Sequence, residues 1–324
     1  MTRLVVDIGG TSIRLAHCRD HSPDLFDISQ FACADYKRVD DVLLEYCARH
    51  KLDNDEFVLA VAGPVDGPLV DITNNQWEFD AGLLASVLGI NRYLIINDFT
   101  AQALAHRGLF QDRQIPANSK LKMLRSGSAD YSTPLLVIGP GTGLGVAALA
   151  PVGDDVKIIQ GEGGHVSYAP RNSTEMHVLR TLQDRFGHVS AERIVSGPGL
   201  ATIFEIQTGQ LKPAPEIGAL ALAGDADAVA AVHLMLQSLA TVAANAAITL
   251  GARAGIVIAG GIVPKLEPLF ATSGFFDRFD DHGRRWSYLQ PIPVYLSTDP
   301  FAALYGASDA FDSQYLQSQI CYLT

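Results

Sequence analysis

Two similar segments of this chain constrain its fold more than any other feature. Each consists of a short apolar strand, a glycine-rich turn that contains a threonine, and a second apolar strand. The first segment covers residues 4–16 and the second covers residues 135–149. Successive N–H groups in such a turn form a concavity that binds anions. Two hairpins of this kind predict a duplicated α/β domain with a nucleotide between the halves.

The match between the two turns is imperfect. When Thr11 is aligned with Thr142, Gly10 falls opposite Gly141, but Asp7 has no acidic counterpart. Adjacent glycines let a ligand approach the backbone closely, and a carboxylate at a strand end can hold Mg²⁺ through water. An ordinary tight hairpin remains the alternative for either turn alone. No lysine follows in the Walker A spacing, so the first turn is not a P-loop.

A pair of polar residues follows another apolar strand. Residues 94–96 are predicted to form a buried strand, Asn97 and Asp98 come next, and a helix is predicted from Thr100 onward. Ligands of open α/β sheets bind at the carboxyl ends of strands. Asp98 is therefore a candidate to accept a proton from a substrate hydroxyl. The alternative is that Asp98 only caps the following helix.

Glu162 and His165 flank two glycines, so both side chains are expected to project from one tight loop. There is no HExxH pattern and no cysteine nearby, which argues against a zinc site. A carboxylate accepts hydrogen bonds from two hydroxyls and an imidazole donates or accepts one, so the pair suits a neutral polyhydroxyl ligand. A glycine turn with a surface glutamate and a structural histidine is the alternative. The Gly260-Gly261 turn would let an adenosine approach the backbone.

Length and charge narrow the classes of function. A chain of 324 residues with 48% hydrophobic residues has room for two domains. Its formal net charge of -11 argues against nucleic-acid binding, which needs a basic surface. Its four cysteines are scattered without a CxxC pair, which suits a reducing compartment. The first apolar run is too short for a signal peptide, so we expect a cytoplasmic protein.

One uncharged stretch, residues 228–252, is long enough to span a bilayer. Polar side chains recur within it at steps of mostly three or four residues, and they mark one face of a helix. These are His233, Gln237, Ser238, Thr241, Asn245 and Thr249. We therefore expect a buried amphipathic helix and no membrane partner.

Taken together, these motifs resemble those of the bacterial glucokinases, in order and in approximate spacing, over nearly the whole chain. The motifs are Asp7-x-Gly9-Gly10-Thr11, Asn97-Asp98, Gly141-Thr142-Gly143-x-Gly145, Glu162-Gly-Gly-His165, AERIVSGPG at 191–199 and IAGGIVP at 258–264. The cysteine-rich zinc motif of related repressors and sugar kinases is absent, which favours the zinc-free branch.

The resemblance implies a fold and an assembly. The fold would be α/β, a duplicated ribonuclease H-like (actin-like ATPase) fold of two α/β domains with an interdomain cleft. The small domain would comprise residues 1–108, completed by a C-terminal helix at 301–324, and the large domain residues 109–300. ATP would lie across the cleft, and glucose would sit deep between the domains. A homodimer is also expected.

The resemblance further implies roles for individual residues. Asp98 would be the general base in the ATP-dependent phosphorylation of glucose at its 6-hydroxyl. Glucose would be bound by Asn74, Asn97, Asp98, Glu162, His165 and Glu192. The phosphates and Mg²⁺ would be held by Val6, Asp7, Ile8, Gly9, Gly10 and Thr11, with Asp7 reaching Mg²⁺ through water. The remaining contacts to ATP would come from Gly141, Thr142, Gly143, Gly145, Gly260 and Gly261. Pro140 removes one N–H donor beside the second turn.

Other functions stay open at this point. The chain could be a kinase for another hexose, such as fructose, mannose or an N-acetylated sugar, or a non-catalytic sugar sensor on the same fold. Against a DNA-binding sensor, the first strand begins at Leu4, which leaves no room for an N-terminal helix-turn-helix. ATP is the expected phosphoryl donor, with ADP and polyphosphate as alternatives.

Overall fold

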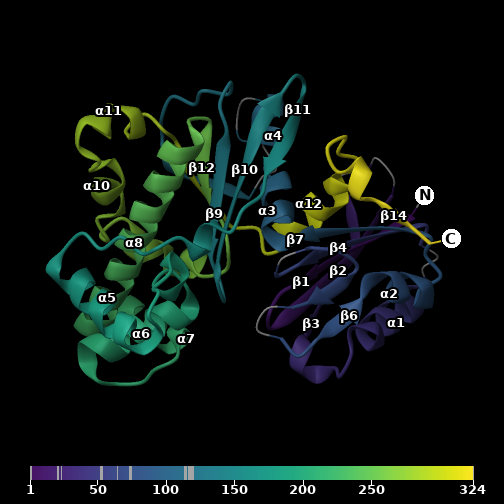
Figure 1. Ribbon diagram of the computed structural model, residues 1–324, viewed down its shortest axis with the longest axis horizontal. Helices are drawn as coiled ribbons and strands as arrows, with labels where there is room; N and C mark the ends of the chain where they lie inside the picture. Colours follow the sequence, from purple (N-terminus) through teal and green to yellow (C-terminus); the bar gives the residue numbers. More distant parts are fainter. Residues whose placement is uncertain are drawn as a thin grey trace. The chain divides into compact units, whose positions relative to one another are not determined.

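The computed structural model describes residues 2–19, 22, 24–51, 54–63, 65–72, 75–112, 115 and 120–323. The chain divides into two compact units. Unit 1 is Met1–Asp112 with Asp299–Thr324, and unit 2 is Arg113–Thr298. Each unit contains a mixed β-sheet with helices (Figure 1), so the fold class is α/β, as expected.

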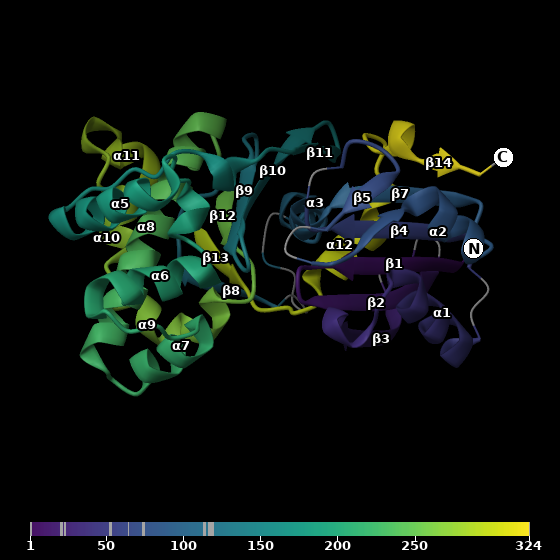
Figure 2. The ribbon, with the colours of Figure 1, turned by 60° about the horizontal axis from the view of Figure 1, so that its bottom comes forward.

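The sheet of unit 1 has the order β14-β7-β4-β1-β2-β3. Its strands β1, β2 and β3 form an antiparallel meander, β4 and β7 run parallel to β1, and β14 is an antiparallel edge. Figure 2 shows β7, β4, β1 and β2 one beside the next. The bounds are β1 (Thr2–Ile8), β2 (Ser12–Arg19), β3 (Leu25–Ala32), β4 (Glu56–Val61), β7 (Arg92–Asn97) and β14 (Cys321–Tyr322).

Helices cover both faces of this sheet, which explains why β1 and β4 are almost continuously apolar. The side chains of Leu4 and Val6 pack with α1 and α2. Arg3 points to the other face, where its guanidinium donates to Ser308 O at 2.6 Å and so ties α12 to the first strand. The remaining elements of unit 1 are η1 (Cys33–Asp35), α1 (Val39–His50), β5 (Leu69–Asp71), β6 (Glu78–Asp80), α2 (Ala81–Val87), α3 (Asp98–Leu104), α4 (Gly108–Asp112), α12 (Ala302–Ala310) and η6 (Gln317–Gln319).

The sheet of unit 2 has the order β11-β10-β9-β12-β13-β8. Strands β9, β10 and β11 form an antiparallel meander, β12 and β13 run parallel to β9, and β8 is an antiparallel edge. Its order and strand directions are therefore the same as in unit 1. The bounds are β8 (Leu121–Arg125), β9 (Leu135–Pro140), β10 (Leu144–Val152), β11 (Asp155–Ile159), β12 (Gly255–Ile258) and β13 (Val294–Ser297).

The long helix α8 (Ala226–Leu250) is central to the core of unit 2 and runs beside its sheet (Figure 1). By length and composition it could cross a membrane, but 72% of its most apolar window is buried. This confirms the expected buried helix. Its polar face is not wholly exposed, because Ser238 and Thr241 are buried as well.

The other helices of unit 2 are α5 (Ser173–Phe186), α6 (Gly197–Thr208), α7 (Ala214–Leu222), α9 (Glu267–Phe270), α10 (Phe275–Asp280) and α11 (Trp286–Leu289). Short 3₁₀ helices are η2 (Gly163–His165), η3 (Ala191–Arg193), η4 (Val263–Leu266) and η5 (Gly283–Arg285).

Candidate active site

Three parallel strands of unit 1 bring the first glycine turn and Asn97-Asp98 to one edge of the sheet. Ile8 at the end of β1 is paired with Val61 at the end of β4, and Val61 is paired with Asn97 at the end of β7. Adjacent strands lie about 4.8 Å apart, so the ends of β1 and β7 are roughly 10 Å apart. The turn and Asn97-Asp98 therefore share one carboxyl edge, where ligands of α/β sheets bind.

Asn97 is the N-cap of α3. Its Oδ1 accepts from the backbone N–H groups of Phe99 at 2.9 Å and Thr100 at 3.3 Å, and its Nδ2 donates to Gly63 O at 3.1 Å. The N-cap is thus Asn97, where the sequence offered Asp98 as the cap. These bonds hold the start of α3 against the loop after β4, and an Asn side-chain amide has one further N–H for a ligand.

Asp98 is the first residue of α3 and is half-buried. One of its carboxylate oxygens, Oδ1, also accepts from Phe99 N–H, at 2.9 Å. The positive end of the helix dipole and this N–H favour the negatively charged carboxylate, which is the form that accepts a proton. Asp98 therefore places a carboxylate at the carboxyl end of β7, at the start of α3.

The first glycine turn is held by backbone and side-chain bonds on both sides. Gly9 N–H donates to Ser12 O at 3.0 Å, and Cys33 N–H donates to Thr11 O at 3.0 Å. Asn75 Nδ2 donates to Gly9 O at 3.4 Å. The Thr11 side chain is exposed beside this turn. Val6 and Ile8 have no exposed surface.

Asp7 lies directly across the hairpin from Arg14, and Arg14 Nη1 is 2.8 Å from Asp7 Oδ2. Asp7 is 5% exposed. Burial raises the pKa of Asp7, and the Arg14 guanidinium acts in the opposite direction. Sequence reasoning missed Arg14, although the register of the predicted hairpin would have placed it opposite Asp7.

The donor set at this edge can be compared with what Mg²⁺ needs. No cluster of three or more His, Cys, Asp or Glu side chains that could hold a metal occurs among the described residues. Mg²⁺ usually keeps several waters and binds one or two carboxylates together with substrate phosphates. A single carboxylate such as Asp7, beside a turn rich in N–H groups, fits that pattern. Arg14 would compete with the ion for the same oxygen.

In unit 2, the second glycine turn is tied to Glu192. Pro140 is paired with Leu144, and Gly141 N–H donates to Gly143 O at 2.8 Å, which closes the turn. Glu192 Oε2 accepts from Leu144 N–H at 2.8 Å. A Cβ added to Gly143 would lie 2.3 Å from the same carboxylate oxygen. Gly143 therefore makes room for Glu192.

Other glycines of the motifs pack against this turn. Gly197 N–H donates to Gly141 O at 2.9 Å. A Cβ on Gly164 would lie 2.1 Å from Leu144 O, and a Cβ on Gly260 would lie 2.5 Å from Pro140 O. Gly260 also has a φ of +80°, which an L side chain rarely adopts. The motif segments of unit 2 thus converge on the carboxyl ends of β9 and β12.

Glu162 and His165 project from the loop that contains η2, as expected. Their side chains are 67% and 61% exposed, and His165 Nε2 is 3.8 Å from Glu162 Oε2. Glu192 is half-buried by contrast. Unit 2 therefore presents two exposed groups and one anchored carboxylate near the second turn.

A short antiparallel bridge connects the segment after His165 to the segment before Glu192. Ala191 N–H donates to Val166 O at 2.8 Å, and Tyr168 N–H donates to Val189 O at 2.9 Å. This bridge links the loop of His165 to the segment that carries Glu192. Sequence reasoning gave Tyr168 no role, since a single tyrosine outside a motif carries no signal of a tertiary contact.

The remaining predicted site residues lie mostly at the exposed or half-buried turns. Asn74 lies outside the described residues. Thr142 and Gly261 are exposed at their turns, Gly145 is half-buried within β10, and Gly10 is half-buried in the first turn.

A family model and a sequence relative each match nearly the whole chain. A family model described as Glucokinase matches residues 4–314. The glucokinase of Pseudomonas paraeruginosa is 40% identical over 318 residues, which cover 95% of this chain and 91% of that protein.

Solved structures are similar as well. A crystal structure of glucokinase from an Antarctic psychrotroph has a TM-score of 0.79 and 28% identity, covering 96% of this chain and 99% of that one. The glucokinase of Balamuthia mandrillaris, solved in complex with glucose, has a TM-score of 0.77 and 23% identity, covering 95% and 92% of the two chains. The family match spans nearly the whole sequence, and the chain therefore belongs to the glucokinase family.

Proposed function

We propose that Asp98 is the general base in this chain's glucokinase reaction, the ATP-dependent phosphorylation of glucose at its 6-hydroxyl. The observation that carries the proposal is the position of Asp98 at the carboxyl edge of unit 1. The side chain starts α3, its negative form is favoured there, and the edge also carries the first glycine turn. A base in this position accepts the hydroxyl proton as the bond to phosphorus forms, worth about 10²–10⁴-fold in rate.

Phosphoryl transfer otherwise requires positioning and charge neutralisation. We assign Asp7, Gly9, Gly10 and Thr11 to the phosphates, and Val6 and Ile8 are assigned by family resemblance alone. Asp7 would hold Mg²⁺ through water, and the ion would neutralise charge on the phosphates. Gly141, Thr142, Gly143 and Gly145 are assigned to phosphate contacts, and Gly260 and Gly261 to the adenosine.

The sugar ligands follow from the same reasoning. Glu192 Oε2 is bound to Leu144 N–H, so we assign Oε1 to a sugar hydroxyl. Glu162 and His165 are exposed and would supply an acceptor and a donor. Asn97 would add one N–H, and Asn74 is assigned by family resemblance alone.

We also infer the finer description of the fold. The two sheets share their strand order and their strand directions, which supports a duplicated ribonuclease H-like (actin-like ATPase) fold. The two units would be the functional domains, with both contributing to one sugar site in a cleft. A cytoplasmic homodimer is part of the same proposal and is supported by family membership alone.

A coupled assay of the purified chain tests the reaction. ATP, ADP and polyphosphate are offered as donors, and glucose, fructose, mannose and N-acetylglucosamine as acceptors. We expect the highest kcat/KM with ATP and glucose. A higher value with another hexose would contradict the substrate assignment, and absence of turnover with every pair would contradict a kinase. The Asp98→Asn variant tests the base: glucose should still bind while turnover falls.

A further inference from the structure

Unit 2 contains a cavity of about 350 Å³ beside the loop of Glu162 and His165. Strands β10 and β11 form one wall, α8 forms another, and the segment around η2 closes a third. Apolar and glycine residues on these walls include Val146, Ile159, Gly161, Gly163, Val242 and Ala246. The volume falls within the usual range for small-molecule sites, about 300–1,000 Å³.

The hydroxyl groups on the floor of the cavity are hydrogen-bonded to other groups of the protein. Ser238 and Tyr168 also line it, and the Tyr168 hydroxyl is 3.1 Å from Ser238 Oγ. Thr241 Oγ1 donates to Gln237 O at 3.3 Å. The buried polar groups of α8 at the cavity, those of Ser238 and Thr241, are therefore already bonded within the protein.

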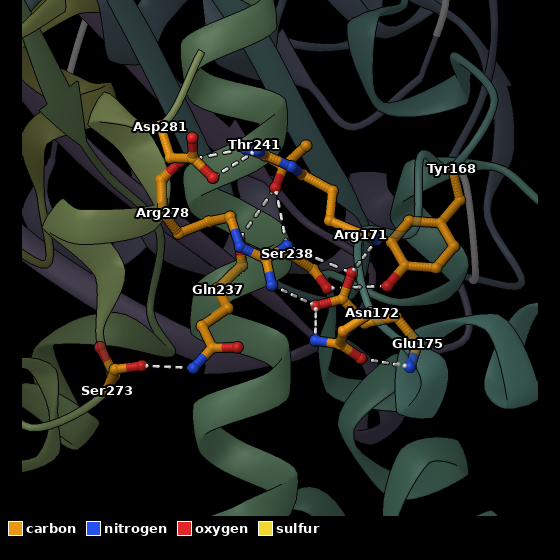
Figure 3. Close-up of polar contacts among 10 residues, drawn as sticks. All are labelled: Tyr168, Arg171, Asn172, Glu175, Gln237, Ser238, Thr241, Ser273, Arg278 and Asp281. Carbon is orange, nitrogen blue, oxygen red and sulfur yellow. Dashed lines mark hydrogen bonds and ion pairs between the residues drawn. The ribbon is translucent and has the colours of Figure 1, made fainter. Parts of the chain in front are cut away.

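A buried ion pair stands next to this floor. Arg278 Nη2 donates to Glu175 Oε1 at 2.8 Å, and Glu175 also accepts from Asn172 Nδ2 at 2.8 Å. Figure 3 shows these groups turned toward one another, between α5, α8 and α10. Neither Arg278 nor Glu175 lines the cavity, and no lining side chain carries a charge. A charged ligand would lose its hydration without gaining a partner, which is costly.

Exposed polar side chains stand at the rim of the cavity. Gln160, Asn245 and Thr249 line the cavity there and are exposed. Asn245 Oδ1 lies 3.2 Å from His282 Nε2, and Thr249 Oγ1 donates to Asn245 O at 2.8 Å. The amides of Gln160 and Asn245 retain hydrogen-bonding capacity for one polar group of a ligand.

We propose that this cavity binds an uncharged, mainly apolar small molecule with one hydrogen-bonding group, and that the bound molecule increases the affinity for glucose. The coupling rests on the proposed function of Glu162 and His165. Gly161, Gly163 and Val166 line the cavity and belong to the same backbone that carries those two side chains.

The contacts of the loop explain how occupancy would act. Glu162 and His165 approach each other only to 3.8 Å and are mostly exposed, so they restrain the loop weakly. On its other side the loop is bonded to the Glu192 segment through Val166 O. A ligand packed against Gly161 and Gly163 would restrict the loop in the conformation that presents its side chains. Coupling is reciprocal, so glucose would equally increase the affinity for the ligand.

The test uses the full chain and prodan, an uncharged naphthalene ketone whose emission shifts to the blue in apolar surroundings. We expect saturable binding of one probe per chain. Saturating probe should lower the KM for glucose by about fivefold, a typical coupling, with kcat unchanged. Glucose should tighten probe binding by the same factor.

Two substitutions block the cavity in different ways. Ala246→Leu fills it from α8, and Thr249→Phe covers its exposed rim without disturbing the core. Both should abolish probe binding while the wild-type glucose KM without probe is retained. Ala230→Leu is the matched control, because Ala230 is an exposed residue of the same helix that does not line the cavity. It should bind the probe as the wild type does.

Three outcomes would overturn the proposal: no saturable binding, binding that survives in both blocking variants, or binding that leaves the glucose KM unchanged. Sedimentation velocity distinguishes one further outcome. If the wild type binds no probe and a blocking variant changes the association state, the cavity lies at a contact between copies of the chain. Wild-type turnover without probe keeps the two proposals apart. If the wild type turns over glucose but does not bind the probe, only the effector site is contradicted. If it shows no turnover, the proposed function is contradicted.

Discussion

Side chains of the candidate site are anchored to different degrees, and backbone groups provide the anchors. Asn97 Oδ1 accepts from two N–H groups of α3, and Glu192 Oε2 accepts from Leu144 N–H. The side chains of Glu162 and His165 are mostly exposed and approach each other only to 3.8 Å. We therefore expect Asn97 and Glu192 to be positioned before the sugar arrives, and Glu162 and His165 to be ordered by it.

The first prediction concerns the space that Gly143 leaves for Glu192. In Gly143→Ala the new Cβ would lie 2.3 Å from Glu192 Oε2, which is too close for both atoms. The Glu192 carboxylate would therefore be displaced from Leu144 N–H. A lost hydrogen bond to a charged group costs about 1.5–3 kcal/mol, so the KM for glucose should rise about tenfold or more. Steady-state kinetics with varied glucose and varied ATP measure this.

Gly141→Ala is the matched control, since a Cβ at Gly141 meets nothing within 4 Å. Its KM for glucose should stay at the wild-type value. An unchanged glucose KM in Gly143→Ala would show that Glu192 does not bind the sugar.

The second prediction concerns two titrating groups of unit 1, the buried His106 and the half-buried Asp309, which is paired with Arg107. Burial lowers the pKa of His106 to about 4. Between that value and the unfolded value of about 6.5, the unfolded chain binds more protons, so acidification through this window lowers stability. Burial raises the pKa of Asp309 to about 6, so the folded chain binds the extra proton there and stability falls as pH rises from about 4 to 6. The two slopes oppose each other.

Urea unfolding at a series of pH values separates the two groups. His106→Gln should remove the loss of stability between pH 6.5 and 4, and Asp309→Asn should make that loss steeper. If both variants show the wild-type pH dependence, these groups do not titrate as their burial implies.

At the scale of elements, close packing of two helices positions Asp98. A Cβ on Gly306 of α12 would lie 1.7 Å from Ala101 O of α3. Asp98 begins α3, so any displacement of this helix also moves its carboxylate. A glycine in the middle of a helix is here a requirement of packing.

The third prediction follows from this contact. Gly306→Ala should destabilise the fold by about 1–3 kcal/mol, the usual cost of overpacking, and should lower kcat although residue 306 is far in sequence from the motifs. Urea unfolding and steady-state kinetics measure the two effects. Gly218→Ala in α7 is the control, because the nearest atom there is a flexible Leu266 methyl at 3.2 Å. Wild-type stability in Gly306→Ala would contradict the packing argument.

The elements differ in how far sequence could predict them. Continuous apolar runs ending in glycine turns predicted β1 and β9, because strands covered on both faces are apolar throughout. Residues 106–134 showed no pattern, yet they include α4 and β8. β8 is an edge strand that is partly exposed along its length, so its sequence shows no clear alternation of apolar and polar residues.

The same limit applies to the site. Motifs predicted Glu192 and the second glycine turn separately, because each has a recognisable local sequence. The bond between Glu192 and Leu144 joins residues 48 positions apart. Only the tertiary fold sets that distance, so no local pattern could have revealed the partner.

At the scale of the whole molecule, the proposed sugar ligands are divided between the two units. Asn97 and Asp98 belong to unit 1, and Glu162, His165 and Glu192 belong to unit 2. If one glucose contacts both sets, its binding energy favours closure of the units around it. Closure would expel water, which otherwise competes as the phosphoryl acceptor.

The fourth prediction is a change of shape with sugar. Saturating glucose should lower the radius of gyration in solution scattering, and Glu192→Gln should require a higher glucose concentration for the same change. ATP without glucose provides the comparison. An unchanged radius at saturating glucose would contradict closure.

The central claim is that Asp98 takes the proton from the glucose 6-hydroxyl, and Asp98→Asn measures it most directly. Asn retains the shape of the side chain and an oxygen that can accept from Phe99 N–H, but it cannot serve as the base. Glucose affinity by calorimetry should stay within about tenfold of the wild type, while kcat falls by at least ~100-fold. A variant that binds glucose and keeps most of its kcat would contradict the assignment of Asp98 as the base.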